Sequence, residues 1–159
     1  MECRMPDILE RIRSLLGAHG FEFREIHHAP TRTSEESARA RGEPLSIGGK
    51  AILLKVDDSF KLFVFSASDR IDSGKVKRRF HAKRIRFATQ DELKEITGLV
   101  PGSVPPFGKP FFSLDLFLDT TITRNSRIAF NAGTLTNSVI MNVQDYLEIA
   151  RPVVFDFSK

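Results

Sequence analysis

The segment "SIGGKAILLKVDDSFKLFVFSA", residues 46–67, constrains the fold more than any other part of the chain. Residues 51–56 are nearly all apolar, which is typical of a central strand with both faces covered. Residues 60–67 are predicted to be its hairpin partner, joined through the polar turn Asp57-Asp58-Ser59. Other elements must therefore pack against both faces of this strand pair.

Short capped or amphipathic segments alternate with further strand-like runs. The segments predicted to be helices are 6–18, 33–42, 72–82, 89–96 and 143–150. Further strands are predicted at 21–28, 85–88, 111–119, 127–133 and 138–142, with 152–157 as an edge strand or tail. This interleaving predicts an α+β fold with a six- or seven-stranded, mixed, barrel-like sheet and short surrounding helices.

The stretch "GLVPGSVPPFGKP", residues 98–110, is either a linker or a stiffened loop. The chain length suits a single domain covering 1–159, and a linker here would leave a second piece of about 49 residues, too small for a comfortable core. We therefore predict a loop inside one domain. Its prolines fix φ, and Gly102 can present a bare N–H that binds an oxyanion, carbonyl or phosphate. The alternative is a purely structural turn.

Composition limits the remaining choices. A single cysteine, Cys3, excludes a disulfide framework and fits a cytoplasmic protein. No signal peptide pattern and no run of about 18 apolar residues is present, so we expect no membrane association. The net charge of +4 allows a phosphate-rich partner or simply a solvated basic surface.

Lys50 follows two glycines at the start of the apolar strand. A lysine at the mouth of a buried strand faces a low dielectric and needs an anionic partner from the protein or a ligand. The alternative is a strand-edge charge in solvent. The four histidines lack zinc-ligand spacing, and G-x-S-x-G, Walker A and G-x-G-x-x-G motifs are absent, so no metal or cofactor is predicted. A site built from one lysine and backbone amides remains.

The stretch "KVKRRFHAKRIR", residues 75–86, is strongly basic. It either follows a phosphate backbone or forms a solvated helix face. The residues that would contact tRNA in the first case are Lys75, Lys77, Arg78 and Arg79.

Several of these motifs, in this order, resemble the YbaK-type family of aminoacyl-tRNA deacylases, which includes the editing domain inserted in bacterial prolyl-tRNA synthetases. The matching segments are "HHAPTRTSEESARARG", "IGGKAILLK", the G-x-x-x-P loop from Gly102 to Pro106 with "PPFG", "LFLD" and "FNAG". The resemblance covers about residues 6–157. It implies a compact α+β domain that hydrolyses the ester between a wrong amino acid and the 3′-terminal adenosine of tRNA.

The resemblance also implies site residues. Lys50 matches the family's essential lysine, which binds the terminal phosphate or the ester carbonyl, and Gly102 matches the loop glycine whose N–H positions the ester. The implied substrate-binding residues are Ser103, Pro106, Asp119, Phe130, Asn131, Ala132 and Gly133. Mischarged aminoacyl-tRNA is the implied partner, with an aminoacyl-tRNA synthetase as a further one.

The chain departs from the synthetase-embedded domains in one respect. Those domains carry a histidine after the F-x-A-G segment, whereas this chain has none after His81. Thr134, Thr136 or Asn137 are the candidates for that place. The amino acid therefore stays open among cysteine-, alanine- and proline-related substrates. A binding module without hydrolysis is the main alternative, and hydrolysis of another small acyl ester is a third.

Overall fold

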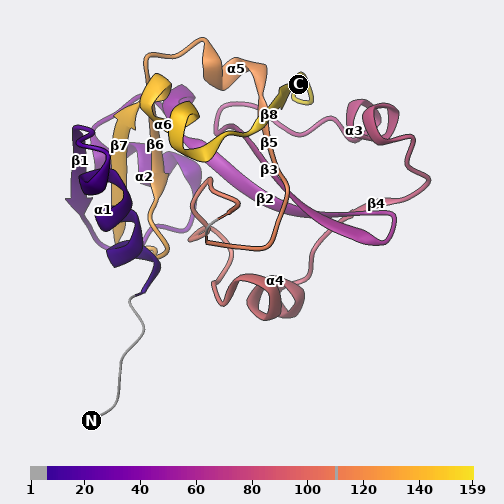
Figure 1. The fold of residues 1–159 in the computed structure, drawn as a ribbon, viewed down its shortest axis with the longest axis horizontal. Coiled ribbons are helices and arrows are strands. Elements are labelled where there is room, and N and C mark those ends of the chain that lie inside the picture. Colours follow the sequence, from indigo (N-terminus) through magenta and orange to yellow (C-terminus); the bar gives the residue numbers. More distant parts are fainter. Residues whose placement is uncertain (1–6, 110) are drawn as a thin grey trace.

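The computed structural model describes residues 7–109 and 111–159; Cys3, Pro6 and Pro110, on which parts of the predictions above depend, lie outside these ranges. Figure 1 shows the chain as short helices around two twisted sheets. The helical elements are α1 (Ile8–Ala18), α2 (Ser34–Arg41), the 3-10 turn η1 (Leu45–Ile47), α3 (Ser73–Phe80), α4 (Gln90–Thr97), α5 (Thr120–Thr123) and α6 (Val143–Ala150). The strands are β1 (Phe23–His27), β2 (Gly49–Val56), β3 (Ser59–Ser66), β4 (Ile85–Phe87), β5 (Leu116–Asp119), β6 (Arg127–Asn131), β7 (Asn137–Asn142) and β8 (Val153–Phe155).

The α+β prediction is confirmed, but the strands of the described chain do not close into a barrel. They form an antiparallel sheet, β1-β7-β6, and a mixed sheet, β4-β2-β3-β5-β8, with parallel β3/β5 and β5/β8 pairs. The two sheets meet where β2 starts, through a single bridge between Gly48 and Ala129. Close approach is needed there, because a Cβ on Gly49 would lie 2.8 Å from the Ile128 side chain.

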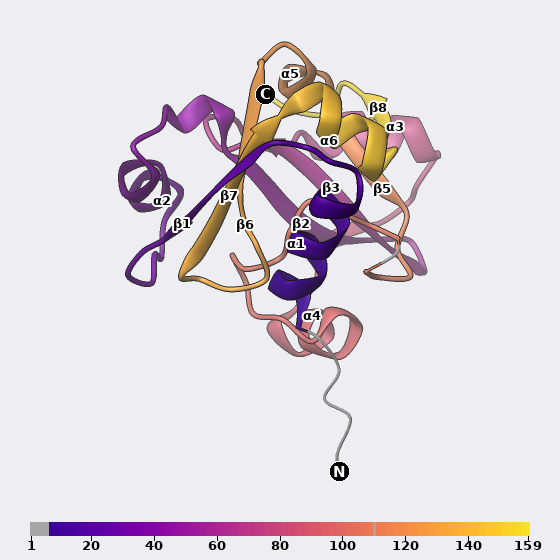
Figure 2. The same cartoon turned by 60° about the vertical axis from the view of Figure 1, so that its left-hand side comes forward.

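The β2–β3 hairpin has apolar clusters on both faces, as predicted. Leu53 belongs to the main cluster, which both sheets share with α1 and α6, whereas Leu54 and Val56 belong to a second cluster beneath α3. Figure 2 shows α1 and α6 in front of the hairpin. The hairpin is therefore the central layer of the fold.

Local signals set most helix ends. Thr89 and Glu92 form a capping box at α4, and Gly98 ends that helix in the left-handed region. Thr33 caps α2 by accepting from the Glu36 N–H, and Gly42 ends it. A full capping box is not formed at α2, because the Glu36 carboxylate accepts from the Arg32 N–H and not from the N–H of Thr33.

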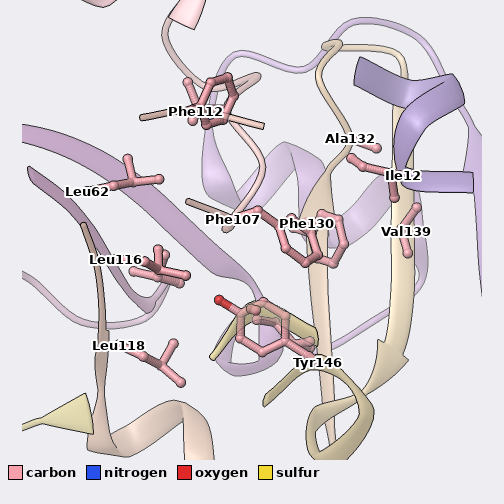
Figure 3. Packing of buried hydrophobic residues seen from close by; sticks show 14 of the residues in the cluster. Ile12, Leu62, Phe107, Phe112, Leu116, Leu118, Phe130, Ala132, Val139 and Tyr146 are labelled. Carbon is pink, nitrogen blue, oxygen red and sulfur yellow. The ribbon is translucent and has the colours of Figure 1, made fainter. Parts of the chain in front are cut away.

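The described part of this stretch, residues 98–109, is a packed loop, which confirms the loop interpretation over the linker. Residues 103–108 are buried. The Phe107 ring lies 5.6 Å from the Phe130 ring and 5.5 Å from the Tyr146 ring, between centroids (Figure 3). The Tyr146 hydroxyl donates a 2.6 Å hydrogen bond to the Pro106 carbonyl. The loop is thus fixed to β6 and α6.

Two further details differ from prediction. The strand expected at 111–119 begins only at Leu116, because the amides of Phe111 and Phe112 bond to the Gly108 carbonyl in a turn. The short helix α5 was not predicted. Within the described residues, no helix has the length and apolar character that crossing a membrane requires.

Candidate active site

A pocket of about 690 Å³ lies between α2, the start of β2 and the Gly102 loop. Its size is within the range of small-molecule sites. The sequence-predicted residues that line it are Lys50, Gly102 and Asn131. Residues from three distant parts of the chain therefore meet at one site.

Lys50 is exposed at the mouth of the pocket, opposite Phe65 in the β2–β3 ladder. The prediction that Lys50 faces a low dielectric is wrong, because β2 becomes buried only at Leu53. Among the described residues, the Lys50 ammonium has no hydrogen-bond or ion-pair partner. It is therefore available to an anionic ligand.

Gly102 presents a backbone donor to the same pocket. Its φ of +87° lies in the region that favours glycine. Its carbonyl accepts a 2.8 Å hydrogen bond from Asn131 Nδ2, while its own N–H donates to no other described residue. An uncommitted amide at a pocket wall can bind a carbonyl or an oxyanion.

Four other predicted residues support this wall without lining the pocket. The Gly133 N–H donates a 2.9 Å hydrogen bond to the Ser103 carbonyl, which ties the Gly102 loop to the end of β6. Phe130 and Ala132 are buried in the main cluster. Their roles as substrate contacts stay predictions. The contacts described here give them a structural role.

Pro106 is buried, and its carbonyl accepts from Tyr146. Desolvation raises the pKa of the Tyr146 hydroxyl above its ordinary value, so that hydroxyl stays protonated and donates. Pro106 therefore anchors the loop from behind the pocket.

Asp119 lies away from the pocket lining. It is fully buried, and its carboxylate accepts from the Phe157 N–H at 2.8 Å, the Ser158 N–H at 3.0 Å and the Ser158 hydroxyl at 2.7 Å, as well as from Thr121. Burial opposes its ionisation, but the hydrogen bonds led by Thr121 outweigh that effect and lower the pKa of Asp119. It holds the C-terminal segment, and a substrate contact stays a prediction.

The basic residues of α3 lie at the opposite end of the molecule from α2 (Figures 1 and 2). Lys75 is engaged, because its ammonium contacts the Asp156 carboxylate at 3.0 Å and the Ser158 carbonyl at 2.9 Å. Arg79 lies over the Phe155 ring, 5.2 Å from the centroid. Lys77 and Arg78 are exposed. A tRNA contact at α3 stays a prediction.

The sequence analysis missed Arg41, which lines the pocket and is only 8% exposed. Its Nε donates to Ser138 Oγ at 2.9 Å and its Nη2 to Asn131 Oδ1 at 3.1 Å. Desolvation lowers its pKa to about 10. The helical stripe Ser37, Ala38, Arg41 was the available signal, since it places a charge on the buried face of α2.

Other missed residues give the pocket its polar character. The hydroxyls of Thr31 and Ser37 are hydrogen-bonded at 2.7 Å and both residues are buried. Arg32 and Arg70 add cationic groups at the edge. By contrast, Thr134, Thr136 and Asn137 bond to one another and do not line the pocket.

A second hollow of about 740 Å³ lies over β1 and β7. None of the predicted site residues lines it. Its walls include Arg24, Arg127 and Asp145. The chemistry suggested by the sequence therefore belongs to the pocket beside Lys50.

The fold and the pocket define a class: an α+β domain that presents a free lysine and a free backbone amide to one polar cavity. Comparison with known proteins agrees. Residues 28–149 match the family described as the aminoacyl-tRNA editing domain. The chain belongs to this family. The predicted resemblance to YbaK-type proteins and the predicted enzyme class, aminoacyl-tRNA deacylase, are thereby confirmed.

Individual relatives cover different shares of the chain. A multifunctional Ser/Thr-tRNA deacylase, ProXp-y, from Escherichia coli K12 is 33% identical over 94% of this chain and 92% of its own. A proline–tRNA ligase from Bacillus licheniformis is 32% identical over 70% of this chain, which corresponds to 19% of the ligase. A solved structure of a candidate trans-editing enzyme for prolyl tRNA synthetase superposes with a TM-score of 0.83, at 25% identity, over 98% of this chain and 99% of that one.

Proposed function

We propose that the protein acts in trans on mischarged aminoacyl-tRNA and hydrolyses the ester between the amino acid and the 3′-terminal adenosine. The observation that carries this proposal is the position of Lys50 and the Gly102 N–H, both uncommitted within the described chain, on one pocket. The acting unit is a single domain covering residues 1–159, and its place of action is the cytoplasm, where aminoacyl-tRNA is made and used.

In the proposed reaction, Lys50 binds the terminal nucleotide's phosphate or the ester carbonyl, and the Gly102 N–H donates to the carbonyl oxygen as negative charge develops on it. Water forms the new bond to the carbonyl carbon, the bond to the ribose oxygen breaks, and a proton passes to that oxygen. The products are the free amino acid and tRNA. An aminoacyl ester is already activated, so positioning supplies much of the required catalysis. A neighbouring ribose hydroxyl can assist the proton transfer.

The polar lining favours a hydroxyl-bearing amino acid, serine or threonine. The hydroxyls of Thr31 and Ser37 and the amide of Asn131 offer both donors and acceptors to such a side chain. These groups already have partners within the chain, so the preference rests on the further hydrogen bonds that they can share with a substrate hydroxyl, which an alanine or proline side chain cannot form. The relative named as a Ser/Thr-tRNA deacylase supports this choice over the cysteine-, alanine- and proline-related substrates suggested by the sequence.

The tRNA end approaches over a cationic edge in this proposal. Arg32 and Arg70 lie at the pocket, and their guanidinium groups are suited to the phosphates next to the terminal adenosine. The exposed Lys77 and Arg78 of α3 would contact the tRNA further away, with smaller contributions from Lys75 and Arg79, which are engaged within the chain. An aminoacyl-tRNA synthetase is a candidate partner for delivering the substrate.

A panel of mischarged tRNAs tests the function. Each tRNA carries a labelled amino acid (serine, threonine, alanine, cysteine or proline), and its release is followed with and without the protein. We expect release from seryl- and threonyl-tRNA. Tight binding of tRNA with no release of amino acid would support a non-catalytic binding module instead. Small model esters are tested beside the panel, and hydrolysis of these alone would support a hydrolase of another small acyl ester.

A further inference from the structure

Arg41 is a buried cation without a counter-ion. Among the described residues no carboxylate lies within ion-pair distance of its guanidinium, although it is only 8% exposed. A desolvated charge without a counter-ion costs stability, which the hydrogen bonds to Ser138 and Asn131 offset only in part. Departures of this kind from good packing are expected where function requires them.

The chemistry of Arg41 fixes how Asn131 points. A guanidinium has only donors, so the Asn131 atom that it contacts at 3.1 Å must be the acceptor Oδ1. Ser138 Oγ lies 3.1 Å from the same oxygen. The amide nitrogen of Asn131 is then directed to the opposite side, where it donates the 2.8 Å hydrogen bond to the Gly102 carbonyl.

The same guanidinium is hydrogen-bonded to Ser138 through Nε and lies close to the start of β2 through Nη1. Ser138 is fully buried, accepts from Arg41 Nε at 2.9 Å, and lies 2.8 Å from His28 Nε2. Arg41 Nη1 is 3.6 Å from the point where a Cβ on Gly48 would lie. Arg41 therefore lies between the strand start that carries Lys50 and the loop that carries Gly102.

We propose that Arg41 is a positioning residue that acts through Asn131: it holds the peptide that joins Gly102 to Ser103, and through the φ and ψ angles of Gly102 it restricts the direction of the free N–H in the preceding peptide, relative to Lys50. This inference rests on the proposed deacylase function. It adds a role for a buried arginine that the sequence analysis did not single out.

Two substitutions separate positioning from structural support. Arg41→Met keeps an unbranched apolar stem but removes every donor. Asn131→Asp keeps an acceptor for Arg41 and supplies its missing counter-ion, but replaces the donor to the Gly102 carbonyl by a second oxygen. Arg39→Met is the matched control, because Arg39 is an exposed arginine on the same helix.

For seryl-tRNA hydrolysis we expect kcat to fall roughly 10- to 100-fold in Arg41→Met and Asn131→Asp, with KM changed less than about threefold. The melting temperature should change little in both. Arg39→Met should match the wild type. A wild-type kcat in both variants would overturn the proposal, and so would an activity loss that simply follows a fall in melting temperature.

The Gly102 amide gives a second measurement that does not need activity. In a ¹H–¹⁵N correlation spectrum of the whole protein, Arg41→Met and Asn131→Asp should shift the Gly102 amide resonance, whereas Arg39→Met should not. If the wild type deacylates no tRNA, the proposed function fails, but this spectrum still tests the relay, that is, the link from Arg41 through Asn131 to Gly102. An unchanged Gly102 amide in both variants would overturn the relay.

Discussion

The hydroxyl of Tyr146 donates a 2.6 Å hydrogen bond to the carbonyl oxygen of Pro106, from the middle of α6 to the Gly102 loop. Both groups are buried, so each would lack a partner without the other. This single contact connects a helix near the end of the chain to the wall of the pocket.

The first prediction concerns this contact. Tyr146→Phe keeps the ring packing against Phe107 but leaves the Pro106 carbonyl unsatisfied. We expect the free energy of unfolding to fall by about 1–3 kcal/mol, measured by urea denaturation. Phe87→Tyr, at an exposed position, is the control and should change it little. A Tyr146→Phe variant as stable as the wild type would contradict the anchoring role.

The second prediction concerns Asp119. The N–H groups of Phe157 and Ser158 and the Ser158 hydroxyl all donate to the Asp119 carboxylate. Asp119→Asn would therefore place an NH₂ group, itself a donor, against these donors. At neutral pH we expect a loss of about 2–4 kcal/mol in the free energy of unfolding, because a buried charged acceptor is removed from its donors.

The pH dependence of that loss follows from the lowered pKa of Asp119. A group with a depressed folded-state pKa stabilises the fold fully above its unfolded value and loses this contribution as pH falls through the folded value. The difference between wild type and Asp119→Asn should therefore be constant well above the ordinary value of 3.8 and shrink below it. Chemical denaturation from neutral to acid pH measures this. A difference that does not vary with pH would argue against the assigned role.

The third prediction concerns Gly102. An added Cβ would meet only Leu135, at 3.5 Å, so Gly102→Ala should fold, with a backbone cost of about 1–2 kcal/mol at its positive φ. Because Gly102 lines the pocket, the substitution should displace its N–H, and we expect deacylation to fall roughly 10- to 100-fold, less than the loss of about 100- to 1,000-fold when an oxyanion donor is removed outright. Gly98→Ala is a matched control, because its φ is +75° and it has open space. Equal activity in the two variants would make the loop only a turn.

The fourth prediction concerns the cationic edge. Replacing Arg32 and Arg70 by alanine should raise KM for aminoacyl-tRNA and flatten the dependence of kcat/KM on salt, because fewer phosphates are neutralised. Lys77→Ala with Arg78→Ala should have a smaller effect, since no residue of α3 lines the pocket and α3 lies across the molecule from α2 (Figure 1). A larger effect at α3 would place the main tRNA contact there instead.

Some features of the fold and the site could be predicted from the sequence, and others could not. The β2–β3 hairpin, the capping box at Thr89 and the ordered set from Lys50 to Gly133 depend on neighbours in the chain or on motif order, and the sequence carries both. The division of the strands into two sheets, joined by the Gly48–Ala129 bridge, depends on pairing between segments that are distant in the sequence. It was therefore not predicted. The exposure of Lys50 and the burial of Arg41 likewise follow from packing between elements. The stripe of Ser37, Ala38 and Arg41 marks one face of α2, but no local pattern shows what packs against that face.

The central claim is that Lys50 and the Gly102 N–H act together on an aminoacyl ester. The most direct test is single-turnover hydrolysis of seryl-tRNA by the wild type and by Lys50→Ala, with Lys55→Ala as a control on the same strand. We expect hydrolysis to be lost in Lys50→Ala while its circular dichroism spectrum and melting temperature match the wild type, and to persist in Lys55→Ala. Wild-type hydrolysis by a folded Lys50→Ala variant would contradict the claim.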